Sequence, residues 1–392
     1  MKKVALGSII LIFSLNAGLV WAGSSQNLVT LGELIYKDKN LSAEKNQSCQ
    51  TCHHPSAGYA DPVNLDNPIE FPVSAGSVTD PAVLYGGRNA PSSAYAGFSP
   101  IFHLDKARGG YVGGMFWDGR ATGDRLGDPL AEQALGPFKN PLEMAMTKDE
   151  VVNAVEVSSY SALFQRVFPG TNFDDIDGTY DNIGRAIAAF ERSAAVTQFN
   201  SKFDQFWEEC QRRKIDISSI NADTDLTSLP AGILTVTQLK GLALFNDVNK
   251  GNCAACHATK NHTDDDGTIY PPLFTEYTYE NIGIPTNWRV YDLYIGAPPD
   301  LGLGGREDLN DENQYGKFKV PTLRNVERTA PYGHNGYFLG LKEVVDFFNT
   351  GDSEEPEVPE TVNETEGIGE LGLTNDEVWQ IVAFLKALTD QK

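Results

Sequence analysis

Two CxxCH pentapeptides constrain this 392-residue chain more than any other feature, one at residues 49–53 (CQTCH) and one at 253–257 (CAACH). Two thiols three positions apart can form thioether bonds to the two vinyl groups of one haem, and the next histidine then becomes an iron ligand. The pattern therefore predicts two covalently bound haem c groups. The predicted attachment residues are Cys49, Cys52, Cys253 and Cys256, and the predicted iron ligands are His53 and His257.

Paired CxxC units also occur in zinc sites and in disulfide frameworks, which is the alternative interpretation of these four cysteines. That alternative explains neither the histidine after each pair nor the export signal at the N-terminus. The fifth cysteine, Cys210, is expected to be a buried thiol rather than a redox group.

The N-terminus has the organisation of a secretory signal peptide. Lys2 and Lys3 precede an apolar run from residue 4 to residue 20, and the small-residue pattern that follows predicts cleavage after Ala22. A membrane anchor is the alternative, but the run is short for a spanning helix and no comparable apolar run follows it. We expect a periplasmic protein without stable membrane insertion.

The charge of the chain is strongly acidic. Loss of Lys2 and Lys3 with the signal would leave 29 of the 31 basic residues against 53 acidic ones, and would change the formal charge from −22 to about −24. Such a surface repels nucleic acid and favours a basic partner, although solubility alone is a sufficient reason for it.

A repeat indicates how the mature chain is organised. The amphipathic segment at 31–36 precedes the first CxxCH motif, and a similar segment at 240–245 precedes the second. We expect a signal peptide at 1–22, an N-terminal cytochrome c domain at 23–211, a linker at 212–230 and a C-terminal cytochrome c domain at 231–392.

Further helices follow from apolar spacing. The spacing over 181–206 predicts one long helix that closes the first domain, and Thr374 with Glu377 forms a capping box for a final helix. The Glu- and Pro-rich segment 354–366 is expected to be a solvated loop. The predicted fold is mainly α, with two cytochrome-c-like domains that face one another and carry long loops.

Seven further motifs are specific enough to indicate a family. The chain resembles the bacterial dihaem cytochrome c peroxidases and their relative MauG over nearly its whole mature length. The motifs, in family order, are RNAP (88–91), FWDGR (116–120), EQ (132–133), GP (136–137), NPLEM (140–144), VPTLRN (320–325) and TAPYGHNG (329–336).

The resemblance implies a role for several residues. The haem at His53 would bind peroxide, and the haem at His257 would receive and relay electrons. Glu143 matches the carboxylate that moves a proton between the peroxide oxygens, and Trp117 matches the indole between the haems. Gln133 and Pro137 match residues of the peroxide pocket. The alternatives are a helix-capping carboxylate for Glu143, core packing for Trp117, and packing or solvent exposure for the other two.

The resemblance also implies a calcium ion between the domains, held by Asn89, Thr329 and Pro331 through one side-chain amide and two backbone carbonyls. No acidic cluster marks this site, and ordinary turn chemistry is the alternative.

The chain departs from the family pattern at the second haem. Family members place Met or Tyr fourteen residues after the His of the PYxH motif, whereas this chain has Phe348 there. Phenylalanine cannot bind iron, so either this iron lacks a sixth ligand or another group reaches it, such as His262, Tyr332, Tyr337 or a loop histidine. At the first haem, His103 is the candidate for a blocking ligand, and an exposed loop histidine is the alternative.

The resemblance implies a peroxidase that takes electrons from a small cytochrome c or a cupredoxin. The alternative is a MauG-like enzyme that uses hydrogen peroxide to oxidise a residue, typically Trp, on a partner protein. A non-catalytic electron carrier is a third hypothesis, which the Glu143 and Gln133 motifs disfavour. Family relatives are often dimers, so a homodimer is compatible with the resemblance.

Overall fold

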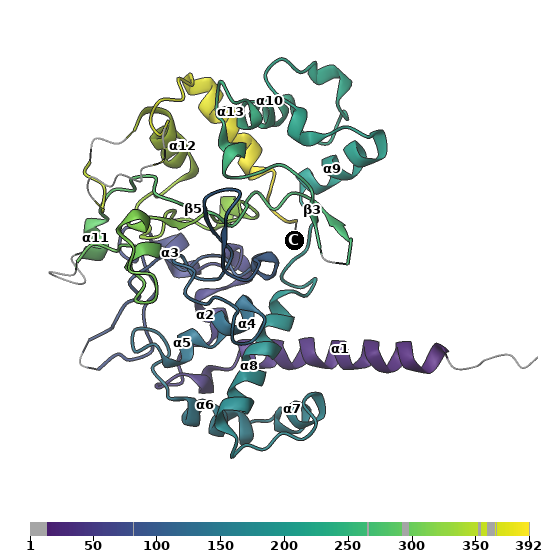
Figure 1. Ribbon diagram of the computed structural model, residues 1–392, viewed down its shortest axis with the longest axis vertical. Helices are drawn as coiled ribbons and strands as arrows, with labels where there is room; N and C mark the ends of the chain where they lie inside the picture. The colour runs from purple at the N-terminus through teal and green to yellow at the C-terminus, as the bar shows by residue number, and fades with distance from the viewer. Residues whose placement is uncertain are drawn as a thin grey trace, which may run out of the picture.

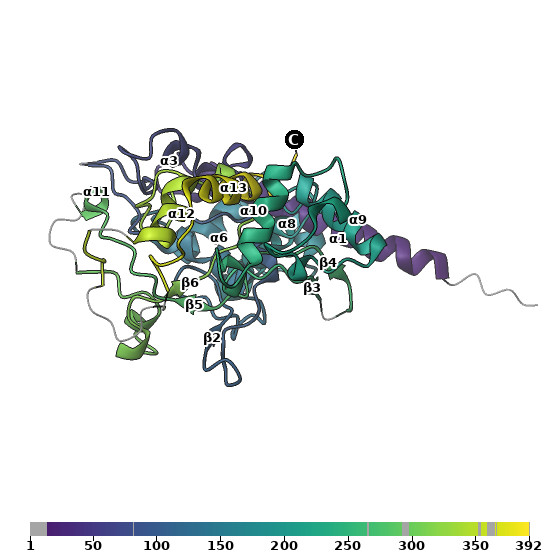
Figure 2. The same ribbon diagram turned by 90° about the horizontal axis from the view of Figure 1, so that it is seen from above.

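The structure is a computed structural model that describes residues 14–391, except 81, 265, 292–297, 352–353, 359–364 and 366. Residues 1–13 of the predicted signal segment lie outside the described residues, and residues 14–22 form the start of helix α1. Figures 1 and 2 show this end of α1 extending away from the body of the protein. Within the described residues, no helix is both long and apolar enough to cross a bilayer.

Helices joined by long loops dominate the described chain, as the mainly α prediction required. The α-helices are α1 (Ser14–Tyr36), α2 (Cys49–Cys52), α3 (Pro62–Asp66), α4 (Pro129–Ala134), α5 (Gly136–Lys139), α6 (Lys148–Glu156), α7 (Ser161–Val167), α8 (Ile176–Glu191), α9 (Lys202–Arg213), α10 (Val236–Asn246), α11 (Trp288–Tyr291), α12 (Leu341–Thr350) and α13 (Asn375–Lys386). Short 3₁₀ turns are η1 (Lys39–Leu41), η2 (Pro55–Ala57), η3 (Ala96–Phe98), η4 (Ile217–Ser219), η5 (Leu226–Ser228), η6 (Cys253–Ala255), η8 (Leu303–Gly305), η9 (Glu312–Gln314) and η10 (Val326–Arg328).

Three two-stranded antiparallel ribbons complete the described secondary structure. They pair β1 (His103–Asp105) with β2 (Gly110–Val112), β3 (His262–Thr263) with β4 (Ile269–Tyr270), and β5 (Tyr279–Glu280) with β6 (Phe318–Lys319). The last ribbon joins segments that lie far apart in the sequence, and it contributes to the wall of the second candidate site below.

Two helix crossings repeat the same design. Helix α1 packs on α8 in the first half, and α10 packs on α13 in the second. A Cβ atom at Gly32 would overlap the carbonyl oxygen of Ala186, and one at Gly241 would overlap that of Gln380. Glycine at each crossing therefore lets the two backbones touch, which is the close approach that this residue permits.

The buried apolar side chains form two large clusters. The first gathers residues of α1, α6 and α8, and the second gathers residues of α9, α10, α12 and α13. The thiol of Cys210 is fully buried in the second cluster, which confirms the expectation for this residue. The capping box of Thr374 and Glu377 is present at α13, so the predicted final helix is confirmed as well.

The expected single helix at 181–206 is instead two helices, α8 and α9. Between them Phe199 has a left-handed backbone conformation, and Ser201 begins α9 with its own capping box. Helix α9 packs in the second cluster, where Ile217 and Ile220 of the expected linker are also buried. We therefore propose that the domain junction lies at 192–201 rather than at 212–230.

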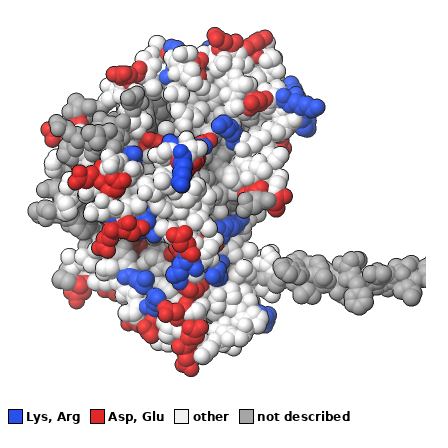
Figure 3. All heavy atoms as spheres, viewed as in Figure 1, with Lys and Arg blue, Asp and Glu red and all other residues white. Residues whose placement is uncertain are grey.

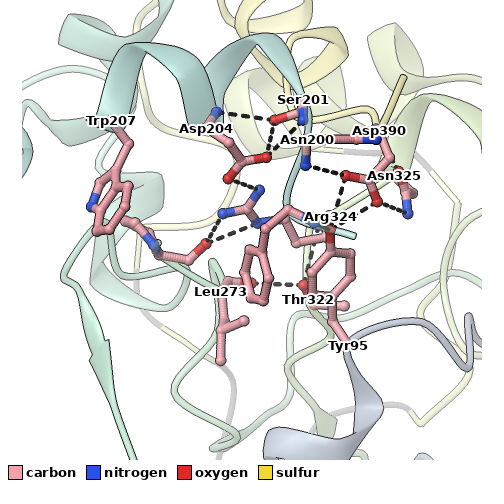
Figure 4. Close-up of polar contacts among 12 residues, drawn as sticks. Tyr95, Asn200, Ser201, Asp204, Trp207, Leu273, Thr322, Arg324, Asn325 and Asp390 are labelled. Atoms are coloured by element: carbon pink, nitrogen blue, oxygen red, sulfur yellow. Dashed lines mark hydrogen bonds and ion pairs between the residues drawn. The ribbon is translucent and has the colours of Figure 1, made fainter. Parts of the chain in front are cut away.

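A buried ion pair of the second half lies against Tyr95 of the first half (Figure 4). Arg324 is almost inaccessible to solvent, and its Nη1 lies 2.7 Å from Oδ1 of Asp204. Its Nε and Nη2 both donate to the carbonyl of Pro272. The guanidinium also lies within 5.1–5.6 Å of the ring centroids of Tyr95, Phe199, Phe203 and Phe274.

Asp390, near the C-terminus, adds a second set of contacts to this junction. Its carboxylate accepts hydrogen bonds from the Tyr95 hydroxyl at 2.8 Å, from Asn325 Nδ2 at 3.0 Å and from the backbone N–H of Asn200 at 3.2 Å. The end of the chain thus binds residues from the N-terminal half, the inter-core segment and the second half.

Candidate haem sites and the residues between them

The first CxxCH motif forms the single turn α2, followed directly by His53. A helical turn places Cys49 and Cys52 on the same face, as two bonds to one planar group require. The His53 Nδ1 lies 3.2 Å from the carbonyl oxygen of Tyr59. With Nδ1 bonded to a carbonyl, the ring is held in place and Nε2 remains for a metal. Burial lowers the pKa of His53 and raises the pKa of both thiols.

The second motif repeats this arrangement. Cys253 begins turn η6 and Cys256 directly follows it. His257 Nδ1 lies 2.8 Å from the carbonyl oxygen of Phe274. Burial lowers the pKa of His257 to about 4, so the imidazole is neutral and able to bind a metal. Burial also raises the pKa of Cys253 to about 12 and that of Cys256 to about 11.

A cavity of about 620 Å³ adjoins the second motif, and Cys253, Cys256 and His257 all line it. Two buried polar atoms in its wall, the Tyr277 hydroxyl and His334 Nδ1, have no hydrogen-bond partner in the described chain. Buried polar groups are normally paired, so these two atoms indicate a polar group of a ligand in the cavity. A haem, which has an apolar ring and two carboxylates, fits this wall.

Glu143 lies beside the first motif. Burial is the main cause of the raised pKa of Cys49 and Cys52, followed by the charge of Glu191 for Cys49 and of Asp61 for Cys52, and the charge of Glu143 adds a smaller contribution to both. Asn140 Nδ2 donates to Glu143 Oε1 at 2.6 Å. Burial raises the pKa of Glu143 itself, against the opposing effects of Asn140 and of the positive charge of Arg120. A half-buried carboxyl with a raised pKa is suited to accept and return a proton.

The other residues predicted for the first site are less closely joined to Glu143. The carbonyl of Pro137 in α5 accepts a hydrogen bond of 3.1 Å from the backbone N–H of Met144, which places Pro137 next to the Glu143 loop. Gln133 is half-buried on α4, and no hydrogen bond of the described residues joins it to Glu143.

Arg120 belongs to this region although the sequence did not single it out. Its guanidinium stacks 3.8 Å from the ring centroid of Phe116, and that ring in turn contacts Gly136. Arg120, Arg125, Lys139 and Lys148 line a hollow of about 570 Å³. Figure 3 shows basic side chains over α4 and α5 with acidic ones next to them, and Arg125 and Lys148 pair with Asp181 and Asp177.

Trp117 lines the cavity of the second motif. Its indole Nε1 donates to the carbonyl of Asn89 at 2.9 Å, and its own carbonyl accepts from the backbone N–H of Lys319 at 2.8 Å. Lys319 is a further residue that sequence analysis missed. Burial lowers its pKa to about 7, and its Nζ donates to the carbonyl of Gly114 at 2.7 Å.

Ion pairs connect the RNAP motif to the FWDGR motif, which carries Trp117, and to the second half. Arg88 of the RNAP motif pairs with Asp118 of the FWDGR motif at 2.6 Å and with Asp300 at 2.5 Å. Burial opposes ionisation of Asp300, but the hydrogen bond from Arg88 lowers its pKa to about 2. These charges fix the loop that carries Trp117 to segments of the second half.

The segment expected to be a solvated loop at 354–366 is in part buried, which corrects that prediction. Glu357 Oε2 accepts hydrogen bonds from His334 Nε2 at 2.8 Å and from Asn335 Nδ2 at 2.9 Å. Burial alone would raise the pKa of Glu357, but the hydrogen bond from His334 brings it below its ordinary value. Residues 359–364 and 366 of this segment lie outside the described residues.

Comparison with known proteins agrees with this geometry. Residues 26–212 match the family model described as di-haem cytochrome c peroxidase. The methylamine utilization protein MauG of Paracoccus denitrificans is 34% identical over 93% of this chain and 89% of its own length. The chain belongs to the dihaem cytochrome c peroxidase and MauG family. Cytochrome c551 peroxidase of Nitrosomonas europaea is 30% identical over 93% of this chain and 80% of its own length.

A solved structure supports the same family. The dihaem peroxidase BthA of Burkholderia thailandensis superposes with a TM-score of 0.74 at 27% identity, covering 93% of this chain and 86% of BthA. Membership of the dihaem peroxidase family makes this chain a haem peroxidase oxidoreductase and implies two haem c groups. The two cysteine pairs, their histidines and the unpartnered atoms of the cavity fit such groups.

The histidine and tyrosine candidates for a further iron ligand are placed as follows. His103 is exposed on β1, and its Nδ1 lies 2.9 Å from the carbonyl oxygen of Ile101. It therefore matches the alternative of an exposed histidine rather than that of a blocking ligand. His262 packs against Phe98 and contacts Asp264, and it does not line the cavity of about 620 Å³. Tyr337 does not line that cavity either. Tyr332 and Phe348 do line it.

The residues suggested for calcium meet only in part. Asn89 Nδ2 donates to the Pro331 carbonyl at 2.7 Å and to the Gly333 carbonyl at 3.3 Å. No hydrogen bond among the described residues joins Asn89 to the backbone carbonyl of Thr329, the third predicted ligand. No group of three or more His, Cys, Asp or Glu side chains able to hold a metal occurs among the described residues. A cation here would require the Asn89 amide to present its oxygen.

Proposed function

We propose that this dihaem peroxidase reduces hydrogen peroxide to water with two electrons from a small redox protein. One peroxide, two electrons and two protons give two water molecules. When bound, the two haem c groups supply the iron at which peroxide is reduced and the iron at which electrons arrive. The observation that supports the proposal is the half-buried carboxyl of Glu143, whose loop contacts the segment before the first motif through the hydrogen bond from the Ala43 N–H to the Met144 carbonyl at 2.8 Å.

Glu143 manages the protons in this proposal. Its carboxylate takes a proton from one oxygen of peroxide and returns it to the other, so that water can leave. Asn140 orients the carboxyl through the bond of 2.6 Å to Oε1. The positive charge of Arg120 keeps the carboxyl from becoming too weak an acid.

Trp117 connects the two halves in this proposal. An indole is oxidisable, so Trp117 can pass oxidising equivalents from the peroxide site to the second half in two short steps. The bond from its Nε1 to Asn89 fixes the plane of the ring. Gln133 and Pro137 would set access to the peroxide site.

The test is Glu143→Gln, with Glu156→Gln as the matched control because Glu156 is exposed on α6. Loss of the acid–base group is expected to lower peroxide turnover by about 10²-fold or more. Both haems should remain attached, as counted by the pyridine haemochrome spectrum. Turnover of Glu143→Gln within a few-fold of the control would remove Glu143 from the mechanism.

A MauG-like reaction is the second candidate, because the chain is 34% identical to MauG and has Phe348 where a Met or Tyr ligand was expected. Such an enzyme would use peroxide to oxidise a residue, typically Trp, on a partner protein. Peroxide turnover with a generic cytochrome c donor, without modification of a partner, would favour the peroxidase.

The setting of this activity is also part of the proposal. A signal peptide cut after Ala22 would deliver the protein to the periplasm, where a cytochrome c or a cupredoxin is the electron donor. We also propose a calcium ion at Asn89, Thr329 and Pro331, and a homodimer. The acidic charge excludes nucleic acid as a partner.

A further inference from the structure

Helix α12 presents only apolar side chains to the cavity of the second motif. Leu341, Val344, Val345 and Phe348 all line this cavity. Their spacing of three and four residues places them on one face of the helix. The polar residues Lys342 and Asp346 pair with each other elsewhere on α12. One wall of the cavity therefore has no side chain that can bind iron.

The side chains that line the cavity and can bind iron are mostly engaged elsewhere. The Tyr332 hydroxyl donates to the Val326 carbonyl at 2.7 Å, and the Tyr95 hydroxyl donates to Asp390. Lys319 Nζ donates to Gly114 and contacts the Met115 sulfur at 3.4 Å. Each of these groups would have to give up a buried contact in order to reach a metal.

Among the described residues, two buried atoms of the cavity wall lack a partner, the Tyr277 hydroxyl and His334 Nδ1, and both residues lie beside strand β6 rather than on α12. The other ring nitrogen of His334, Nε2, already bonds to Glu357. The ring of His334 stacks on Phe318 with centroids 3.5 Å apart and planes 8° apart. The ring centroid of Tyr277 lies 5.8 Å from Lys319 Nζ. Each of these two atoms can donate a hydrogen bond into the cavity, so they suit the two carboxylates of one haem better than its iron.

We propose that α12 leaves one side of the C-terminal haem iron without a side-chain ligand, and that this side is a second binding site for a small uncharged ligand such as carbon monoxide. This inference rests on the proposed function only in requiring a haem at Cys253 and Cys256. An apolar wall supplies no hydrogen bond to a charged ligand and no acid–base group for peroxide, so the second site binds without cleaving.

The contrast with the first site supports a division of labour. There the carboxyl of Glu143, the amide of Asn140 and the nearby guanidinium of Arg120 provide proton transfer and charge. On α12, the group that occupies the expected ligand position is the phenyl ring of Phe348. Ligand chemistry at the two irons therefore differs because of the residues of this chain.

Carbon monoxide titration of the fully reduced holoprotein tests the proposal, with uptake counted per haem. Phe348→Met adds a thioether at this position, and Phe348→Leu is the control that remains apolar. Phe348→Met is expected to take up one equivalent fewer than wild type and to gain a low-spin spectrum at one haem. Phe348→Leu is expected to bind as much as wild type.

Equal uptake by wild type and Phe348→Met would overturn the inference. Greater uptake by His334→Ala than by wild type would also overturn it, because His334 would then be the ligand. Failure of the proposed function gives different results. Fewer than two haems in wild type, or full turnover by Glu143→Gln, would refute that function whatever Phe348→Met does.

Discussion

The buried pair of Arg324 and Asp204 allows a sharp test of what stabilises the second half where it meets Tyr95 of the first half. Arg324→Met keeps a long apolar side chain but removes the charge, and it leaves the carboxylate of Asp204 buried. The remaining partner of that carboxylate is Ser201, whose hydroxyl and backbone N–H donate to Oδ2 at 2.6 and 2.8 Å. The Pro272 carbonyl also loses both of its donors from Arg324.

The expected cost follows from this geometry. Removing one partner of a buried ion pair costs roughly 3–5 kcal/mol, because an uncompensated charge stays behind. Arg324→Met should therefore lower the free energy of unfolding of the holoprotein by about that amount. Adding Asp204→Asn removes the stranded charge, so the double variant should recover part of the loss.

Urea unfolding followed by far-ultraviolet circular dichroism measures both effects. The comparison requires similar slopes for the variants, so that the midpoints report stability. A loss below about 1 kcal/mol for Arg324→Met would show that the pair does not hold the junction. A double variant that is less stable than the single one would show that the loss comes from packing on the four rings and not from the charge.

Two further predictions concern Trp117 and Glu191. Trp117→Phe keeps a ring but removes the oxidisable indole, so electron transfer between the halves, measured by stopped flow, should slow by about tenfold or more. Trp379→Phe is the control, because Trp379 is exposed on α13, and it should not slow the transfer. An unchanged rate in Trp117→Phe would exclude Trp117 as the relay. Burial raises the pKa of Glu191 to about 8, so its contribution to stability is complete below the unfolded pKa of about 4.3 and is lost as the pH rises through 8. Glu191→Gln should therefore be more stable than wild type by roughly 1–4 kcal/mol at pH 9 and equal to it at pH 4, as measured by thermal unfolding. Equal stability at pH 9 would show that the charged carboxylate of Glu191 is well accommodated.

Elements whose structure is determined by residues close to them in the sequence could be predicted. The motif at 49–53 forms its own turn, the segments at 31–36 and 240–245 are helical, and the capping box at Thr374 starts α13. In each case the signal lies within a few residues of its effect. The proposed place of Glu143 beside the first cysteine pair came from the family resemblance and not from local pattern.

Contacts between distant segments could not be predicted in the same way. Glu357 lies 23 residues from His334, in a segment whose composition indicates solvation, and only the fold brings the two together. The break between α8 and α9 depends on the backbone of Phe199 and on the capping box of Ser201, which the apolar spacing did not reveal. Lys319 directly precedes the VPTLRN motif, but no local pattern indicates its contacts with Gly114 and Met115.

The position of Asp390 in the chain sets the order in which the protein can be assembled. Its bonds to Tyr95, Asn200 and Asn325 cannot form until residue 390 has been synthesised. Both cysteine pairs emerge earlier, so haem attachment can proceed on a chain whose halves are not yet locked together.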